Sequence, residues 1–255
     1  MVSLYLPYLS SSNAFQIHVS PGRTALYNEK YKQSQFVFGS RIRQRSALIH
    51  SLKVIKTVIF DLGKVIVPFD FSRGYRAMAE LCSYAPEEIP KRIGSTDLVR
   101  RFECGEVPPD QFFEQLCRLL DLRMEYAHFC EIWSSIFLPH TLIPENLLEG
   151  LRRRYRLLLL SNTNAIHFKM IRENYPLLSH FDDYVLSYEV GAMKPSPRIY
   201  EEAIARAQCA PGECFFTDDI AEYVTAARQA GMDAVQFQSA AQIEAELLGR
   251  GVSWE

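Results

Sequence analysis

The stretch "VIFDLGKVIV", residues 58–67, contains the pattern that decides the fold. Residues 58–60 are apolar, and a single acidic residue, Asp61, ends the run. Short and continuous apolar runs are typical of strands that are covered on both faces, as in a parallel sheet. We therefore predict a buried strand that ends in a reactive carboxylate, with Gly63 standing where a second acidic residue would be expected.

Similar apolar runs follow downstream, and helical patterns separate them. The expected strands are residues 56–61, 156–162, 182–187, 213–219 and 233–238. The expected helices between them are residues 144–155, 196–207 and 220–231. The last helix ends at Gly231, a residue that suits the left-handed position after a helix. Alternation of strands and helices predicts an α/β fold with a doubly wound parallel sheet.

Residues 72–138 interrupt this alternation, because they contain no convincing strand. Apolar residues repeat at helical spacing from Phe112 to Leu120, and residues 125–137 form a second amphipathic segment. We predict a small all-helical cap domain, residues 72–138, inserted after the first strand of a core domain formed by residues 54–71 and 139–248. The cap leaves the sheet at the edge where ligands bind in open α/β folds, so it is expected to act as a lid.

Polar residues follow the ends of four predicted strands. They are, in chain order, Asp61, then Ser161 and Asn162, then Lys194, then Asp218 and Asp219. Each is ambiguous alone, because aspartates often cap helices, Ser-Asn pairs often form turns and loop lysines are usually solvated. The carboxyl ends of parallel strands meet at one edge of the sheet, so the whole set is expected in one cleft.

The residue types in this cleft suit phosphoryl transfer. Three carboxylates repel one another unless a cation lies among them, and oxygen ligands are those that Mg²⁺ prefers. Ser161 and nearby backbone N–H groups can bind phosphate oxygens, while Lys194 can neutralise charge on the phosphate and the nucleophile. Asp61 is then the candidate nucleophile that forms an aspartyl-phosphate. A shared ion requires the Asp61 and Asp219 side chains to lie within about 8 Å of each other.

The segments VIFDLGKVIV, LLLLSNTN, GAMKPSPRIY and FFTDDIAEYVTAARQAG resemble, in this order, the four motifs of the haloacid dehalogenase-like (HAD) hydrolase superfamily. The resemblance covers about residues 54–240. FDLG, FDFSR, LSNTN followed by His167, and KPSPRIY are most similar to the bacterial glucose-1-phosphate phosphatase branch, with the phosphatase domain of soluble epoxide hydrolases as a related neighbour. The resemblance implies a Rossmann-like core, a cap of the first type, Mg²⁺ dependence and hydrolysis of a phosphate ester.

The resemblance also implies a role for each matching residue. The expected site consists of Asp61 and Lys194 as catalytic residues, Ser161 and Asn162 as phosphate ligands, and Asp61, Asp219, Asp218 and Gly63 as metal ligands. Gly63 would contribute its backbone carbonyl, which any residue retains. Asp219 corresponds best to the metal ligand of the fourth motif, and Asp218 would assist directly or through water.

The sequence departs from the common family pattern at two positions. Gly63 replaces the second aspartate of motif one, which acts as general acid and base and is typically worth about 10²–10⁴-fold in rate. Asp70, near the entrance to the cap, is a candidate substitute, although a helix cap or hinge is an alternative role for it. Tyr223 stands where many relatives have an aspartate or asparagine that supports the metal site. His167 is a candidate for contact with the cap.

Three functions are compatible with these motifs. The leading expectation is a Mg²⁺-dependent phosphatase of a small phosphorylated metabolite, with sugar phosphates among the candidates. A HAD-fold module that binds or senses a phosphometabolite with weak or no turnover is the alternative that Gly63 and Tyr223 favour. A haloacid dehalogenase is a third, because halide leaves without an acid, but such an enzyme does not need the Asp218–Asp219 pair.

Composition and charge argue against several other classes of protein. The chain is 48% hydrophobic with a formal net charge of −2, so it lacks the basic character of a nucleic-acid-binding protein. No apolar stretch reaches eighteen residues, so no membrane span is expected. The six cysteines include no C-x-x-C pair, which fits reduced thiols in a cytoplasmic protein. The expected partner is a small phosphorylated substrate, and a monomer or weak dimer is the expected state.

The first 53 residues differ from the remainder. They hold seven Lys and Arg but one acidic residue, Glu29, and they show no sustained helical period. A targeting peptide shares the basic and acid-poor composition but needs an amphipathic helix. Residues 1–53 are therefore expected to be a poorly structured extension.

Overall fold

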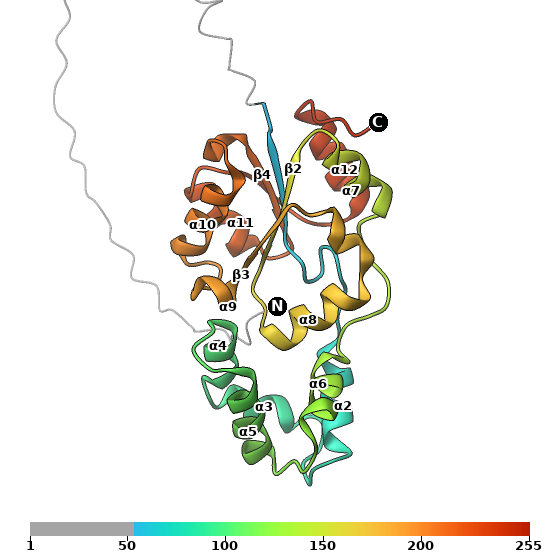
Figure 1. Ribbon diagram of the computed structural model, residues 1–255, viewed down its shortest axis with the longest axis vertical. Helices are drawn as coiled ribbons and strands as arrows, with labels where there is room; N and C mark the ends of the chain where they lie inside the picture. Colours follow the sequence, from blue (N-terminus) through green and yellow to red (C-terminus); the bar gives the residue numbers. More distant parts are fainter. Residues whose placement is uncertain (1–53) are drawn as a thin grey trace, which may run out of the picture. The chain divides into compact units, whose positions relative to one another are not determined.

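The computed structural model describes residues 54–255, so the expectation for residues 1–53 concerns a part of the chain outside this description. The strands are β1 (Thr57–Phe60), β2 (Arg156–Ser161), β3 (Asp183–Leu186), β4 (Cys214–Asp218) and β5 (Asp233–Gln236). They form one parallel sheet in the order β3-β2-β1-β4-β5, with β1 at its centre (Figure 1). This order confirms the predicted α/β fold with a doubly wound sheet.

Helices cover both faces of the sheet. They are α7 (Glu145–Arg152), α8 (Ala165–Asn174), α9 (Ser187–Val190), α10 (Pro197–Ala207), α11 (Ala221–Gln229) and α12 (Ala240–Gly249), with short 3₁₀ helices at Pro176–His180 and Pro211–Glu213. Alternate residues of β1 point to opposite faces: Val58 packs in the cluster that includes α7, α8 and α12, and Ile59 packs in the cluster that includes α10 and α11. Burying such a side chain contributes about 1.5–3 kcal/mol, which explains why the central positions of β1 are apolar.

The segment between β1 and α7 is helical. It consists of α2 (Phe71–Ala79), α3 (Ile89–Gly94), α4 (Leu98–Glu103), α5 (Pro109–Leu120) and α6 (Tyr126–Ser134). These helices have an apolar core of their own, in which the rings of Phe102 and Phe112 stack with centroids 4.0 Å apart. The segment matches the predicted cap in position and composition, and the division of the chain into cap and core domains stays a prediction.

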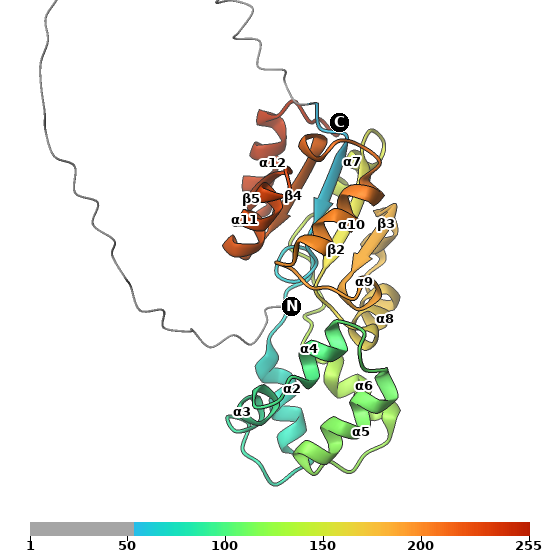
Figure 2. The same cartoon turned by 90° about the vertical axis from the view of Figure 1, so that its left-hand side faces the viewer.

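The helical segment lies at the carboxyl ends of the strands. Figures 1 and 2 both show α2–α6 beside α8 and α9, and α6 contacts α8 while α4 contacts α9. The chain enters and leaves this segment through two paired linkers, in which Asp70 N donates to Ile136 O at 2.8 Å and Leu138 N donates to Pro68 O at 2.9 Å. The pairing brings the helical segment directly over the end of β1.

Candidate active site

Asp61 follows β1 and is fixed by the sheet. Its backbone N–H donates to the carbonyl of Thr217 at 3.0 Å, which continues the ladder between β1 and β4. Because β1 lies between β2 and β4, the residues that end these three strands meet at one edge. Asp61 is 3% exposed and Asp218 is fully buried, so both carboxylates lie inside the protein.

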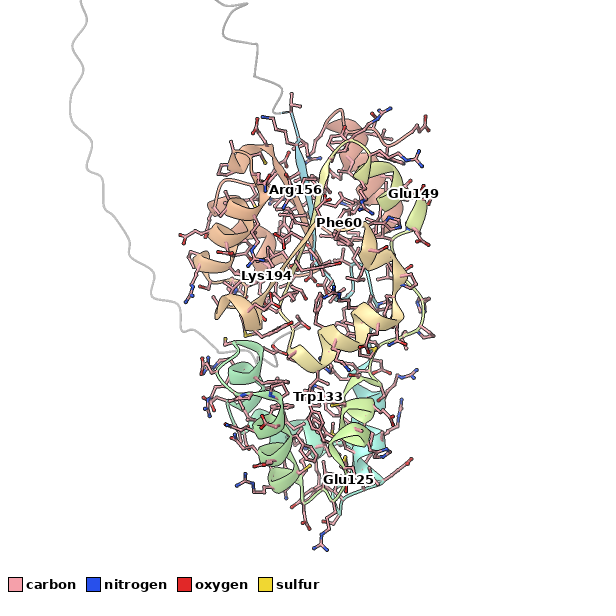
Figure 3. All side chains as sticks on the ribbon, viewed as in Figure 1. Phe60, Glu125, Trp133, Glu149, Arg156 and Lys194 are labelled. Carbon is pink, nitrogen blue, oxygen red and sulfur yellow. The ribbon has the colours of Figure 1, made fainter. Side chains whose placement is uncertain are left out.

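Lys194 joins the two carboxylates. Its Nζ donates to Asp61 Oδ1 at 2.7 Å and to Asp218 Oδ2 at 2.6 Å, and it also contacts the carbonyl of Leu160 at 3.2 Å. Figure 3 shows Lys194 in the interior near the strand ends. Asn162 holds the loop that carries this lysine, because Lys194 N donates to Asn162 Oδ1 at 2.7 Å and Asn162 Nδ2 donates to Lys194 O at 3.0 Å. The structure therefore connects three of the four predicted strand ends through one ammonium group.

The charges of this cluster are unequal. Burial disfavours the ammonium of Lys194, but the carboxylates of Asp218 and Asp61 outweigh burial and raise the pKa of Lys194. Burial also raises the pKa of Asp218, and the negative charge of Asp61 adds to this effect. Burial followed by repulsion from Asp61 raises the pKa of Asp219. One lysine therefore lies among three acids, and both burial and mutual repulsion disfavour their ionised forms.

The three acids lie close enough together to share one divalent cation. One carboxylate oxygen from each of Asp61, Asp218 and Asp219 lies within 4.8 Å of the others, and Asp219 is partly exposed. An all-oxygen donor set suits Mg²⁺, and a divalent charge would neutralise the excess negative charge. The residues present therefore fit a Mg²⁺ ion, and the separation of Asp61 and Asp219 lies well inside the expected limit of about 8 Å.

Ser161 presents an unpartnered hydroxyl beside the acids. Ser161 is 1% exposed, and its Oγ has no hydrogen-bond partner within the described chain. With Leu62, Gly63, Asn162 and Thr163 it lines a small cavity that the linker residues Ile136 and Phe137, together with Phe69, close from the cap side. A buried hydroxyl without a partner costs about 1–3 kcal/mol, so a ligand oxygen is its natural partner.

Two further candidates from the sequence have structural roles. Asp70 is the N-cap of α2, where its oxygens accept from Ser72 N at 2.9 Å and Ser72 Oγ at 2.8 Å. The hydrogen bonds from Ser72 lower the pKa of Asp70, which makes this exposed carboxylate a poor proton donor. Of its two proposed roles, the structure therefore supports the helix cap.

His167 faces the cap, as expected, but as a buried neutral ring. Its Nε2 lies 2.9 Å from the carbonyl of Trp133, and its ring stacks on the Trp133 ring at 5.3 Å. Asn164 Nδ2 lies 3.0 Å from Nδ1, so an Nε2–H tautomer satisfies both contacts. Burial lowers the pKa of His167 to about 3. Figure 3 places Trp133 where the helical segment approaches the sheet, so this contact joins the two.

Tyr223 covers the cluster on the side of α11. Its hydroxyl lies 3.5 Å from Asn162 Nδ2, and its ring centroid lies 5.2 Å from Lys194 Nζ. Burial raises the pKa of Tyr223 to about 12, so the phenol stays protonated near neutral pH. The position therefore carries a neutral hydroxyl in place of the acid or amide that the family resemblance implies.

The structure adds one residue that the sequence interpretation did not select. Glu103, at the end of α4, is 2% exposed, and its Oε1 has no hydrogen-bond partner among residues 54–255. A signal existed in the sequence, because Glu103 lies four residues after Val99 on the side of α4 that packs in the cap core. Its neighbours Arg100 and Arg101 instead form exposed ion pairs with Glu106.

Comparison with known proteins identifies the family of this chain and finds phosphatases among its relatives. Residues 55–231, more than half of the chain, match the profile of the family described as haloacid dehalogenase-like hydrolase. A D-ribitol-5-phosphate phosphatase from Bacteroides thetaiotaomicron is 28% identical over 200 residues, which cover 76% of this chain and 97% of the relative. Phosphatase MT3486 from Mycobacterium tuberculosis is 28% identical over 193 residues, covering 71% of this chain and 86% of the relative.

Solved structures agree with this assignment. A HAD family enzyme from Bacteroides thetaiotaomicron, in complex with magnesium and inorganic phosphate, superposes with a TM-score of 0.66 at 26% identity. The match covers 72% of this chain and 95% of that chain. The predicted family is thereby confirmed, while the narrower resemblance to glucose-1-phosphate phosphatases stays a prediction.

Proposed function

This chain belongs to the haloacid dehalogenase-like hydrolase family, and we propose that it is a Mg²⁺-dependent phosphatase of a small phosphorylated metabolite. One observation carries the proposal: three carboxylates whose oxygens lie within 4.8 Å of one another stand beside the unpartnered hydroxyl of Ser161. The phosphatases among its relatives, and the magnesium and phosphate bound by a structural neighbour, support it.

The residues divide the proposed reaction between them. Ser161 Oγ and backbone N–H groups at the start of α8 bind phosphate oxygens. Asp61 attacks phosphorus through one carboxylate oxygen, the bond from phosphorus to the ester oxygen breaks, and an aspartyl-phosphate forms on Asp61. The leaving oxygen takes a proton from water, because Gly63 offers no acid. A second water then attacks phosphorus and gives its proton to the hydroxide that the first water left, the bond from phosphorus to Asp61 breaks, and phosphate and the free Asp61 carboxylate are released.

Lys194 and the neighbouring acids keep the nucleophile in place. The hydrogen bond of 2.7 Å from Lys194 fixes one oxygen of Asp61, and Asp218 holds the lysine from the other side. Asp61, Asp218, Asp219 and the carbonyl of Gly63 would hold Mg²⁺, which when bound supplies positive charge to the phosphate oxygens. Asp219 is the least buried of the three acids. Unlike Asp61 and Asp218, it forms no ion pair with Lys194 within the described chain.

The test is release of phosphate from p-nitrophenyl phosphate. The wild-type protein should require Mg²⁺, and Asp61→Asn should lower kcat by about 10³-fold or more, because an amide is a poor nucleophile. Asp110→Asn, at an exposed position in the first turn of α5, is the matched control and should keep wild-type activity. Unchanged activity in Asp61→Asn would falsify the proposal.

A second variant addresses the metal site without relying on turnover. Asp219→Asn should weaken Mg²⁺ binding, measured by isothermal titration calorimetry, by about tenfold or more, because it removes one charged ligand. Asp110→Asn again serves as the control. Mg²⁺ binding of equal strength in Asp219→Asn and the wild-type protein would place the ion elsewhere.

One alternative rests on a specific feature, the lack of an acid at Gly63. A module that binds phosphometabolites without turnover would show Mg²⁺-dependent binding of a phosphate compound and no phosphate release across a metabolite panel. Phe69, Phe137 and Ile136 close the cavity beside Gly63, and they supply no proton donor through their side chains. A haloacid dehalogenase would instead release halide in the presence of EDTA.

We also propose a cellular location and an oligomeric state for the protein. All six cysteines are free thiols, which suits a cytoplasmic location. None of the helices between residues 54 and 255 combines the length and apolar character that crossing a bilayer requires. A monomer or weak dimer stays a prediction, which light scattering would check.

A further inference from the structure

Glu103 is a buried carboxylate that the proposed reaction does not use. The other charged side chains that are buried within residues 54–255 are Asp61, Lys194 and Asp218, and these bond to one another. Glu103 is 2% exposed and its Oε1 has no hydrogen-bond partner in the described chain. Leaving a carboxylate buried without a partner is unfavourable, which points to a ligand as the missing partner.

The segment after Glu103 packs against the chain that leads to Lys194. A Cβ atom added to Gly105 would lie 2.1 Å from the carbonyl oxygen of Tyr188. The carbonyl of Cys104 lies 3.9 Å from the position that a Cβ on Gly191 would take. These contacts place the end of α4 against α9 and Gly191, and Gly191 lies three residues before Lys194 in the sequence.

The charge of Glu103 acts on Tyr223, a residue that borders the site. Burial is the main cause that raises the pKa of Tyr223, and the carboxylate of Glu103 is one of the negative charges that add to it. The Tyr223 hydroxyl lies 3.5 Å from Asn162, next to Ser161. Glu103 thus acts on Tyr223 through its charge, and the helix that carries it contacts α9, which precedes the loop of Lys194.

The chemistry of Glu103 suits hydroxyl groups. Burial raises the pKa of Glu103 to about 7, so near neutral pH the group can accept a hydrogen bond as a carboxylate or donate one as an acid. Lys194 is the buried cation of residues 54–255, and Asp61 and Asp218 already engage it. A second anionic group on a substrate would lack a buried cation and would approach the Glu103 carboxylate.

Building on the proposed phosphatase function, we propose that Glu103 binds hydroxyl groups of the leaving group and so selects monophosphates of neutral polyhydroxylated compounds, polyols and sugars. Phosphorylated carboxylic acids and bisphosphates are disfavoured, because their second anionic group meets the same carboxylate. Glu103 is thus a specificity residue contributed by the cap, opposite the phosphate-binding residues of the sheet.

The test compares three substrates in matched variants. Ribitol 5-phosphate carries hydroxyls, pentyl phosphate is its hydroxyl-free counterpart, and 6-phosphogluconate adds a carboxylate. Glu103→Ala and Glu103→Gln are compared with Glu106→Gln, a control at an exposed position just beyond α4. Activity on p-nitrophenyl phosphate in the wild-type protein tests the phosphatase function separately.

We expect Glu103→Ala to lower the ratio of kcat/KM for ribitol 5-phosphate to that for pentyl phosphate by about tenfold or more, mainly through KM, because it removes a hydrogen bond to a charged group. Glu103→Gln should raise kcat/KM for 6-phosphogluconate by about tenfold, because repulsion is lost. An unchanged ratio in Glu103→Ala would overturn the proposal. A fall of kcat in Glu103→Ala that is equal for pentyl phosphate and ribitol 5-phosphate would also overturn it, because Glu103 would then act as a proton donor.

Binding decides the proposal even without turnover. Calorimetry of ribitol 5-phosphate with Asp61→Asn, alone and combined with Glu103→Gln or Glu103→Ala, measures the contribution of Glu103 directly. Weaker binding by about tenfold in the combined Glu103→Ala variant supports it, and equal binding overturns it. Glu103→Gln keeps the shape of the side chain and serves where Glu103→Ala does not fold. Stronger binding of 6-phosphogluconate to the combined Glu103→Gln variant supports the proposal, and unchanged binding overturns it.

Discussion

The ammonium of Lys194 donates a hydrogen bond of 2.6 Å to Asp218, and both side chains are buried. Removing one partner of a buried ion pair leaves an uncompensated charge, which typically costs about 3–5 kcal/mol. Lys194→Met should therefore lower the free energy of unfolding by about that amount and abolish phosphate release. Urea unfolding measures the change, and Mg²⁺ should restore part of the stability by neutralising the freed acids.

Lys169→Met is the control for this substitution. Lys169 pairs with Glu173 on the surface, and exposed pairs contribute about 0–1 kcal/mol. A similar small loss in Lys194→Met would mean that the Asp218 carboxylate is protonated in the folded protein.

The unpartnered hydroxyl of Ser161 predicts a separation of stability from binding. Ser161→Ala removes a buried Oγ that has no hydrogen bond to lose, so it should not destabilise the ligand-free protein and should raise its free energy of unfolding by up to about 1–3 kcal/mol. KM for p-nitrophenyl phosphate should rise by about tenfold, because a phosphate oxygen loses a charge-assisted hydrogen bond.

Ser187→Ala is the control for Ser161→Ala, because the hydroxyl of Ser187 does have hydrogen-bond partners in the protein. Its Oγ accepts from Thr163 N at 2.9 Å and donates to Thr163 O at 2.9 Å, so its loss should destabilise the protein by about 1–3 kcal/mol. Equal destabilisation in both serine variants would show that Ser161 has an internal partner.

The buried ring of His167 predicts a pH dependence of stability. Burial lowers the pKa of His167 from 6.5 to about 3, so between these values the unfolded chain binds a proton that the folded chain does not. Stability from this residue is complete above about pH 6.5 and is lost as the pH falls, by about 2 kcal/mol at pH 5. His167→Gln should therefore show a smaller loss of stability than the wild-type protein between pH 7 and pH 5.

Chemical denaturation at several pH values measures this slope. His128→Gln, on an exposed part of α6, is the control and should keep the wild-type slope. A wild-type slope in His167→Gln would show that His167 is charged in the folded state.

The close contact of Gly105 with the backbone of Tyr188 predicts that substitution of this glycine lowers stability. Gly105 has φ +70°, and an added Cβ would lie 2.1 Å from Tyr188 O, so Gly105→Ala should strain the backbone and separate α4 from α9. We expect a fall in melting temperature of about 4 °C or more. Gly94→Ala is the control: nothing lies within 4 Å of its added Cβ, and alanine should stabilise α3 by about 0.5–1 kcal/mol. Equal melting temperatures in the two variants would contradict the contact.

The sheet and its edge were predictable because their signals are local. Each strand is an apolar run, and the convergence of parallel strand ends brought Asp61, Lys194 and Asp218 together without any further information. The helix α8 had no such signal, because buried His167 interrupts its apolar face. The link between Asn162 and the Lys194 backbone also depends on loop geometry that composition does not encode.

The burial of Glu103 could be predicted only in part, because its spacing from Val99 indicates the packed side of α4 but does not show that its carboxylate lacks a partner. Acidic residues on short helices usually face solvent, as Glu106 nearby does. The packing of α4 in the cap core and near α9, a helix that begins at Ser187, accompanies this burial. Tertiary contacts between segments so distant in the chain cannot be predicted from local sequence.

The central place of β1 has a consequence for synthesis on the ribosome. Its two neighbours begin at Arg156 and Cys214, so β1 emerges first and waits for both partners. Helices α2–α6, which pack on one another, are translated in the interval and can become compact early. We expect nascent chains arrested before Cys214 to be cut by protease near β1 while the helical segment already resists digestion.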